Sequence, residues 1–297
     1  MIRLYNYENN FGDDLSPYII SKLSGEKVVL RKPFSLSRFG LDFLRFFKKL
    51  LLKGVADKSL LAYSPFNKVI ISIGSILEES TSNSIVWGSG LGSKDIKIKG
   101  GEFLAVRGPL SQKRLSELGL KVPEVIGDPA ILLPLIYPRK NAIIKKRFKV
   151  GVIPHKIDYV DIVSDLQKLN LEDFLVIDLV DPNLEKVMDD FLSCDMILSS
   201  SLHGLIVSHS YNIPAVWFQK SPLAGDGSKF VDYFSSVGIT PYSYINYEDI
   251  DFSNNEVVKE IFNKASDVSL ANKNNISNIQ KNLLDVAPFK VKEHYKL

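Results

Sequence analysis

One segment in the second half of the chain limits the possible folds most strongly. The apolar run at residues 196–199 is typical of a buried parallel strand, and a helix-like segment follows it at once and ends before Pro214. Small hydroxyl residues, His203 and Gly204 lie where strand passes into helix. Such a junction points several backbone N–H groups and the positive end of the helix dipole at one spot. Ligands bind at such spots in open parallel sheets, so we expect an anion site next to His203.

Strand-like and helix-like segments alternate along the whole chain. The first half contains predicted strands at 2–5, 69–73, 85–87 and 103–106 and predicted helices at 13–23, 37–53 and 109–118. The second half alternates from strand to helix at 149–153, 159–169, 174–179, 183–192, 196–199, 204–211 and 215–218. This pattern predicts parallel sheets covered on both faces. We therefore expect an α/β protein with two Rossmann-like domains that face each other across a cleft.

The length of 297 residues allows two domains of about 150 residues each. The basic segment 140–147 is typical of a linker, so we place an N-terminal Rossmann-like domain at 1–145 and a C-terminal one at 146–255. Residues 256–297 are helical in pattern, with a polar surface rich in asparagine. We expect this tail to pack outside the two cores.

Composition and charge exclude several classes of protein. The net charge of +3 is too small to indicate a nucleic-acid partner. Cys194 is the single cysteine, so an internal disulfide is excluded, and we expect a small buried group rather than a nucleophile. The sequence shows no signal peptide and no run of about 18 uncharged apolar residues, so we expect a cytoplasmic protein.

Polar and glycine-rich loops follow the first strands. Asn10, Asp13 and Asp14 join the first strand to the first helix around Gly12, which predicts a tight turn with an aspartate as helix cap. Alternatively, these side chains bind the hydroxyl groups of a sugar acceptor. The pair Gly74 and Ser75 and the Gly-x-Gly-x-Gly pattern at 88–92 allow a ligand close to the backbone, but they also form turns. The second pattern lacks the full dinucleotide fingerprint, which disfavours a nucleotide site there.

Three cationic residues lie at predicted strand ends or helix starts. Arg107 ends the fourth strand just before a helix, where a guanidinium can bind phosphate or carboxylate through two hydrogen bonds. A structural ion pair is the alternative for Arg107. His155 follows the first strand of the second domain and is either a ligand-binding group or a capping or surface group. Lys229 follows a glycine-rich loop and either contacts phosphate or belongs to a plain loop.

The remaining histidines do not form a metal site by spacing. His209 lies six residues after His203, about 120° around a helix from it, so the two are poorly placed to share an ion. We expect His209 to be a core or interface residue. No other cluster has metal-ligand spacing, so we predict neither a metal nor a cofactor.

The predicted helix at 37–53 combines phenylalanine and leucine with a stripe of charged residues, mostly basic. Such a helix can lie on an anionic membrane surface, which would give the protein a peripheral position on the inner face of the membrane. The alternative is a long surface helix packed on its own domain.

Together these motifs resemble the polysaccharide pyruvyltransferase family over roughly residues 6–238. The resemblance rests, in chain order, on NNFGDDLSPYI, VWGSGL, AVRGPLS, GDPAILLP, GVIPH, SSSLHGLIVSHSYNIPAVW and KFVDYFSSVGI. The chain is most similar to those members of the family that form a pyruvate ketal on a sugar of an exopolysaccharide repeat unit.

The resemblance implies a GT-B-like fold, with the acceptor side in the first domain and the donor side in the second, and phosphoenolpyruvate as donor. The family's donor-associated residues fall on Arg107, Leu202 and His203, and the N-terminal loop would face the acceptor, which we expect to be a lipid-linked oligosaccharide. His203 would protonate the methylene carbon of the donor. Arg107 and the helix start around Ser201 and Gly204 would hold its anionic groups.

Two other functions stay open at this point. A nucleotide-sugar glycosyltransferase of the same architecture often carries two glutamates eight residues apart, and Glu248 and Glu256 have that spacing, although the usual glycines between them are missing. A non-catalytic glycan-binding protein is the other alternative, and it predicts that replacing His203 leaves function intact.

Overall fold

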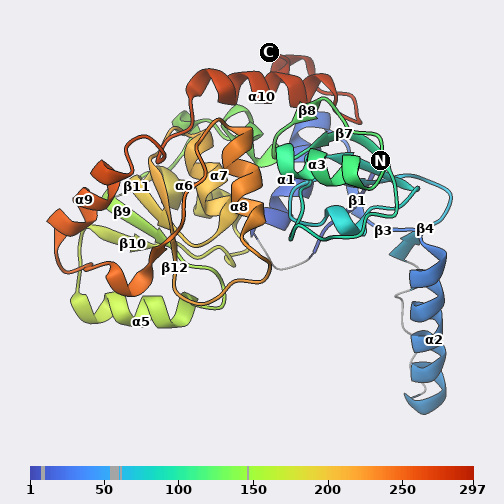
Figure 1. The fold of residues 1–297 in the computed structure, drawn as a ribbon, viewed down its shortest axis with the longest axis horizontal. Helices are drawn as coiled ribbons and strands as arrows, with labels where there is room; N and C mark the ends of the chain where they lie inside the picture. The colour runs from blue at the N-terminus through green and yellow to red at the C-terminus, as the bar shows by residue number, and fades with distance from the viewer. Residues whose placement is uncertain (8–10, 54–59, 61, 146) are drawn as a thin grey trace.

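The strands form two parallel sheets, one from each half of the sequence (Figure 1). The computed structural model describes residues 1–7, 11–53, 60, 62–145 and 147–297. Within these residues the first sheet has the order β2-β1-β5-β6-β7-β8 and the second has the order β10-β9-β11-β12-β13. Every pairing in both sheets is parallel, which confirms the predicted α/β class.

The predicted strands and helices are present, with differences of a few residues at their ends. The strands of the two sheets are β1 (Ile2–Tyr5), β2 (Val28–Leu30), β5 (Val69–Ile71), β6 (Ser84–Trp87), β7 (Glu102–Val106), β8 (Val125–Ile126), β9 (Phe148–Ile153), β10 (Phe174–Val176), β11 (Cys194–Ser199), β12 (Ala215–Gln219) and β13 (Ile245–Asn246). A small separate pair is formed by β3 (Lys32–Pro33) and β4 (Tyr63–Ser64). The helices are α1 (Phe11–Ser24), α2 (Leu36–Lys53), α3 (Pro109–Glu117), α4 (Leu133–Ile136), α5 (Tyr159–Leu169), α6 (Leu184–Leu192), α7 (Leu202–Ser210), α8 (Ser228–Ser236), α9 (Asn255–Lys264) and α10 (Lys273–Asp285).

Each sheet has one point at which its strand order reverses. In the first sheet this point lies between β1 and β5, and in the second it lies between β9 and β11. Loops that leave two such neighbouring strands run in opposite directions and open a crevice at the carboxyl ends of the strands. The topology therefore predicts that ligands bind beside the loops after β1, β5, β9 and β11.

The two halves share one apolar core. The Phe11 ring at the start of α1 stacks on the Phe191 ring of α6, with 5.9 Å between the ring centroids. Helix α7 packs on the 3-10 helix η3 (Pro129–Leu132) of the first half, whose residues are all buried. Cys194 is buried as predicted, and burial raises the pKa of its thiol to about 12, so it is not a nucleophile near neutral pH.

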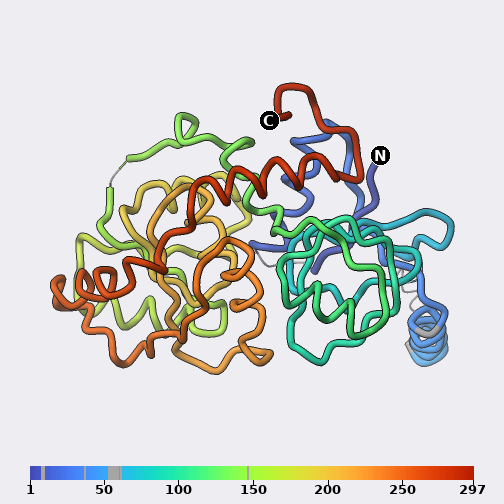
Figure 2. Tube along the Cα trace, turned by 45° about the horizontal axis from the view of Figure 1, so that its top comes forward, coloured from blue at the N-terminus to red at the C-terminus, as the bar shows by residue number. Residues whose placement is uncertain are grey.

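The C-terminal helix α10 crosses from the second half back to the first, as Figure 2 shows. The indole N–H of Trp87 donates to the carbonyl of Leu283 over 2.9 Å, and the side-chain amide of Gln280 donates to the carbonyl of Ile131 over 2.8 Å. Ile279 and Leu283 are buried against the first half. The expectation that the tail packs outside the cores is therefore wrong for α10, because one apolar face of this asparagine-rich helix completes the core.

Helix α2 extends away from both halves (Figure 1). Its first turns are tied to the body through Phe39, whose ring packs on those of Phe34 and Tyr63. Farther along, Leu44 is 67% exposed and Leu51 is 81% exposed. Among the described residues, the aromatic contacts of α2 with the rest of its half lie at its beginning. Within the described residues, no helix is both long and apolar enough to cross a bilayer.

Candidate active site

A cavity of about 210 Å³ lies where the carboxyl ends of the two sheets meet. It sits beside both points of strand reversal, because its walls come from the loops after β1, β5, β9, β10 and β11 and from the starts of α1, α7 and α8. The first half contributes Tyr7, Asp13, Gly74, Ser75 and Ile76. The second half contributes Pro154, His155, Lys156, Leu179, Val180, Ser201, Leu202, His203 and Lys229.

His203 lies in the first turn of α7 and faces a buried carboxylate from the other half. Its Nε2 atom is 3.7 Å from Oδ2 of Asp128, and the side chain of Asp128 is fully buried. The other oxygen of Asp128 caps η3 by accepting a hydrogen bond from the Ala130 N–H over 3.0 Å. Within the described residues, neither Nε2 of His203 nor Oδ2 of Asp128 has a hydrogen-bond partner. Since buried polar atoms usually have partners, each is the natural partner of the other, and the carboxylate fixes the orientation of the ring.

The imidazole of His203 also lies directly against Gly12 at the start of α1. A Cβ atom at position 12 would lie 1.9 Å from Nδ1 of His203, which no side chain can tolerate. Gly12 is helical and is not among the glycines with positive φ. The predicted tight turn at Gly12 is therefore wrong: this glycine provides space for the histidine of the opposite half.

The second half lines the cavity with two lysines, Lys156 and Lys229, and with the imidazole of His155. Burial and the neighbouring Arg107 guanidinium lower the pKa of the Lys229 ammonium. Burial and the Lys229 charge lower the pKa of His155. The N-cap residue of α7, Ser201, forms no capping hydrogen bond with its side chain. The positive N-terminal end of this helix therefore faces the cavity. A buried ammonium with a second cation nearby favours an anionic ligand next to it.

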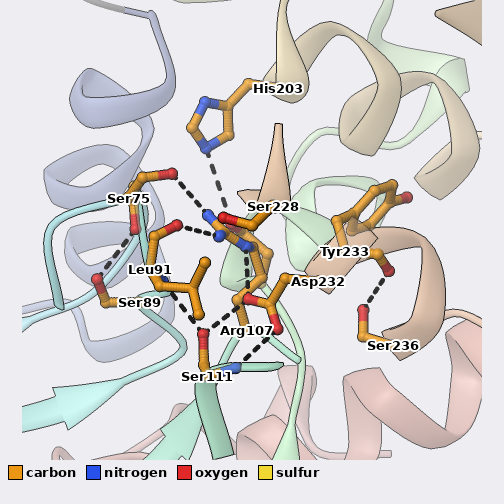
Figure 3. Close-up of polar contacts among 12 residues, drawn as sticks. Ser75, Ser89, Leu91, Arg107, Ser111, His203, Ser228, Asp232, Tyr233 and Ser236 are labelled. Atoms are coloured by element: carbon orange, nitrogen blue, oxygen red, sulfur yellow. Dashed lines mark hydrogen bonds and ion pairs between the residues drawn. The ribbon is translucent and has the colours of Figure 1, made fainter. Parts of the chain in front are cut away.

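Arg107 does not line the cavity but lies behind Ser75 (Figure 3). Its guanidinium is fully buried and donates to Asp232 over 3.2 Å, to Ser75 Oγ over 2.8 Å and to the Leu91 carbonyl over 2.6 Å. Gly90 makes room for it, since a Cβ there would lie 2.3 Å from the guanidinium carbon. The structure thus contains the ion pair that the sequence left as an alternative, and direct donor binding by Arg107 stays a prediction.

The partner of Arg107, Asp232, connects the two halves. It lies on α8 and accepts hydrogen bonds from the N–H and the hydroxyl of Ser111 in the first turn of α3, over 3.0 and 2.7 Å. The cap residue of α3, Gly108, makes no side-chain cap bond of its own, so α8 supplies the cap. Because Lys229 lies one turn before Asp232 on α8, this contact also fixes Lys229 at the cavity.

Other predicted site residues are placed differently. Asn10 lies outside the described residues, and Asp14 is on α1 but does not line the cavity. Gly204 is not a cavity residue either: it packs against Ser199, whose Oγ would lie 2.1 Å from a Cβ at position 204. Asp128 is the functional candidate that sequence reasoning missed. Its motif, Gly-Asp-Pro before a helix, indicates a cap, and nothing in the sequence shows that the same carboxylate meets His203.

Among the described residues, no group of three or more histidine, cysteine, aspartate or glutamate side chains is arranged to hold a metal ion. His209 is buried as predicted, with Nδ1 2.9 Å from the hydroxyl of Tyr233.

Burial lowers the pKa of His209 to about 4, whereas its ordinary value is 6.5. A depressed pKa means that the unfolded chain binds the proton more readily, so stability is lost as pH falls from 6.5 toward 4. Because of this group, we expect the free energy of unfolding to fall by about 2 kcal/mol when the pH is lowered from 7 to 5. Urea unfolding of His209→Gln at both pH values should show a pH dependence smaller by this amount. The exposed His294→Gln is the control, and an unchanged pH dependence in His209→Gln would contradict the prediction.

Comparison with known proteins identifies a family. A family model described as polysaccharide pyruvyl transferase matches residues 10–221, which include every cavity-lining residue except Tyr7 and Lys229. The chain is also 34% identical over 180 residues to an uncharacterized protein of Acanthamoeba polyphaga mimivirus, a match that covers 59% of this chain and 62% of that relative. The chain thus spans less than two thirds of the length of the curated relative. No solved structure matches the chain significantly.

Proposed function

Since the chain belongs to the polysaccharide pyruvyl transferase family, we propose that it is a transferase that acts on polysaccharide, with phosphoenolpyruvate as its donor and a cyclic pyruvate ketal as its product. One observation carries this proposal. A single small cavity brings His203 and the cations of the second half against Asp13 and Ser75 of the first half. Such a site can hold a small anion and deliver protons to it.

The size and charge of the cavity support phosphoenolpyruvate. This donor carries a phosphate and a carboxylate on three carbon atoms, and a space of about 210 Å³ suits it. Lys229, His155 and the N-terminus of α7 would hold the two anionic groups through charge-assisted hydrogen bonds.

The reaction needs one proton on carbon and two attacking hydroxyl groups. His203 donates a proton to the methylene carbon of the donor, which turns the enol carbon into an oxocarbenium-like centre. One sugar hydroxyl attacks this carbon and loses its proton. The C–O bond to phosphate then breaks, and the second hydroxyl attacks and closes the ketal. Of the two hydroxyl protons, one replaces the proton that His203 gave up and the other leaves with phosphate.

The residues of the first half would serve the acceptor. Asp13 is buried at the cavity wall and Ser75 lines the same cavity, so we assign Asp13 as the base that accepts a hydroxyl proton and passes it to the departing phosphate. Arg107 would act as a positioning residue, because it holds Ser75 directly and Lys229 through Asp232 and α8. Opposed sheet ends that share one cavity support a GT-B-like arrangement of the two halves.

The test is an assay of the purified full chain with phosphoenolpyruvate and a panel of lipid-linked and synthetic glycosides. We expect phosphate release coupled to a gain in acceptor mass that matches a pyruvate ketal. A parallel reaction with sugar nucleotides checks the rival activity. Glycosyl transfer from a sugar nucleotide, without ketal formation from phosphoenolpyruvate, would overturn the proposal.

The glutamate pair that favoured a nucleotide-sugar donor lies away from the cavity. Glu248 and Glu256 have side chains that are 81% and 78% exposed and pair with Lys220 and Lys259. Neither glutamate lines the cavity.

Replacing Lys229 by glutamine is expected to raise the KM for phosphoenolpyruvate about 10- to 100-fold, because a hydrogen bond to a charged group is worth about 1.5–3 kcal/mol. The loss should fall mainly on KM, since Lys229 holds the donor and does not transfer a proton. Steady-state phosphate release measures it. Lys220→Gln is the matched control, because Lys220 is similarly shielded but pairs with Asp165 outside the cavity. An unchanged KM in Lys229→Gln would remove Lys229 from the donor site.

A further inference from the structure

Helix α2 presents a broad apolar face that the rest of the described chain does not cover. At 100° per residue, eight of its ten phenylalanine and leucine side chains fall on an arc of about 160°, whereas Leu41 and Leu52 lie on the opposite side among the basic residues. Six side chains on this arc are well exposed: Leu36 79%, Phe43 42%, Leu44 67%, Phe47 44%, Leu50 38% and Leu51 81%. The helix points away from both sheets (Figure 1). A contiguous apolar surface of this kind indicates an interaction site.

The opposite face of α2 is strongly basic. It carries Arg38, Arg45, Lys48 and Lys49 with a single carboxylate, Asp42. Arg38 pairs with Glu79, and Asp42 is engaged by Lys32 and Arg45, each over 3.2 Å, and by the hydroxyl of Tyr63 over 3.0 Å. The helix thus carries more cations than carboxylates, and its exposed Arg45 and Lys48 suit an anionic surface.

We propose that α2 lies in the surface of an anionic membrane, with its apolar face among the acyl chains and its basic residues at the headgroups. A phenylalanine- and leucine-rich face opposite lysines and arginines is the pattern of helices that bind in this plane. A second copy of the chain fits less well. It would bring the same excess of cations against itself, and a two-helix seam needs a narrower apolar stripe than this one.

The base of α2 is connected to the catalytic cavity. Arg38, in the first turn of the helix, forms an ion pair with Glu79, and it also donates to the Glu78 carbonyl over 3.2 Å. Glu79 in turn accepts a hydrogen bond over 2.9 Å from the hydroxyl of Tyr7, which lines the cavity. A membrane-bound α2 therefore holds the cavity near the headgroups. This last step rests on the proposed function: it supports a lipid-linked oligosaccharide as the acceptor.

The proposal is tested by sedimentation of the full chain with vesicles. We expect binding to vesicles of equal parts phosphatidylcholine and phosphatidylglycerol, and little binding to phosphatidylcholine alone. The double variant Leu44→Glu, Leu51→Glu should bind about 100-fold more weakly or worse, because it places charges on the apolar face. Arg45→Ala with Lys48→Ala should weaken binding about 25-fold, since each cation near an anionic surface contributes about fivefold.

Val160→Glu on α5 is the matched control, because Val160 is 75% exposed but lies on a helix remote from α2 (Figure 1). It should bind like the wild type. Equal binding of wild type and Leu44→Glu, Leu51→Glu, or no binding to the anionic vesicles, would overturn the proposal. So would a wild-type dimer that Leu44→Glu, Leu51→Glu dissociates, because the apolar face would then belong to a second copy. The vesicles contain neither donor nor acceptor, so failure here leaves pyruvyl transfer to water-soluble acceptors as a separate question.

Discussion

Replacing His203 by glutamine is expected to lower the kcat of phosphate release from phosphoenolpyruvate about 10³-fold, with the fold intact. The glutamine amide nitrogen can take the place of Nε2, which lies 3.7 Å from the buried carboxylate of Asp128, but it cannot carry a proton to carbon. General acid catalysis by a positioned side chain commonly contributes about 10²–10⁴ in rate. The loss should therefore appear in kcat, while the KM for the donor changes little.

The measurement is phosphate release under single-turnover conditions, with thermal unfolding recorded in parallel. His203→Ala serves as a second variant: it should be as inactive, and less stable, because it leaves the Asp128 carboxylate buried without a partner. In D₂O the wild-type enzyme should place one deuterium in the methyl group of the ketal. Normal turnover by His203→Gln would refute the role of His203 as acid and would reopen the glycan-binding alternative.

The central strands and the site edge could be predicted because they depend on local pattern. Strand β5 and the second half of β11, from Ile197, are buried on both faces, and each strand is followed by small residues before a helix or turn. The carboxyl ends of parallel strands meet at one edge, so His155 and His203 could be expected on the same side of one sheet. The structure places both in the cavity.

Two kinds of feature could not be predicted from the sequence: short edge strands without an apolar run, and residues whose role depends on the other half of the chain. The edge strands β2, β8 and β13 are two or three residues long and half buried or exposed, so they leave no apolar run to recognise. The polarity of α10 hides the apolar face with which it covers the first half. Arg107 shows the same limit: its position before α3 is typical of an anion site, but its partner, Asp232, lies 125 residues away on α8.

Gly12 gives the sharpest test of how the two halves are joined. Its replacement by alanine would place Cβ 1.9 Å from Nδ1 of His203, so the imidazole must rotate away from the cavity. We expect Gly12→Ala to lose about 10²–10³ in kcat, close to the effect of removing the histidine itself. Since the ring is the movable end of a side chain, the cost in stability should be smaller, about 1–2 kcal/mol.

A double-mutant cycle separates this contact from a general effect on α1. In the His203→Ala background the space next to position 12 is empty, and alanine has a higher helix propensity than glycine by about 1 kcal/mol. Gly12→Ala should then be neutral or stabilising, which gives a coupling energy of about 1–3 kcal/mol in chemical unfolding. Gly40→Ala in α2 is the control, since among the described residues no atom outside its own stretch of helix lies within 4 Å of its Cβ position, and it should retain full activity. Equal destabilisation by Gly12→Ala in both backgrounds would mean that the glycine serves α1 alone and that the first half does not position the histidine.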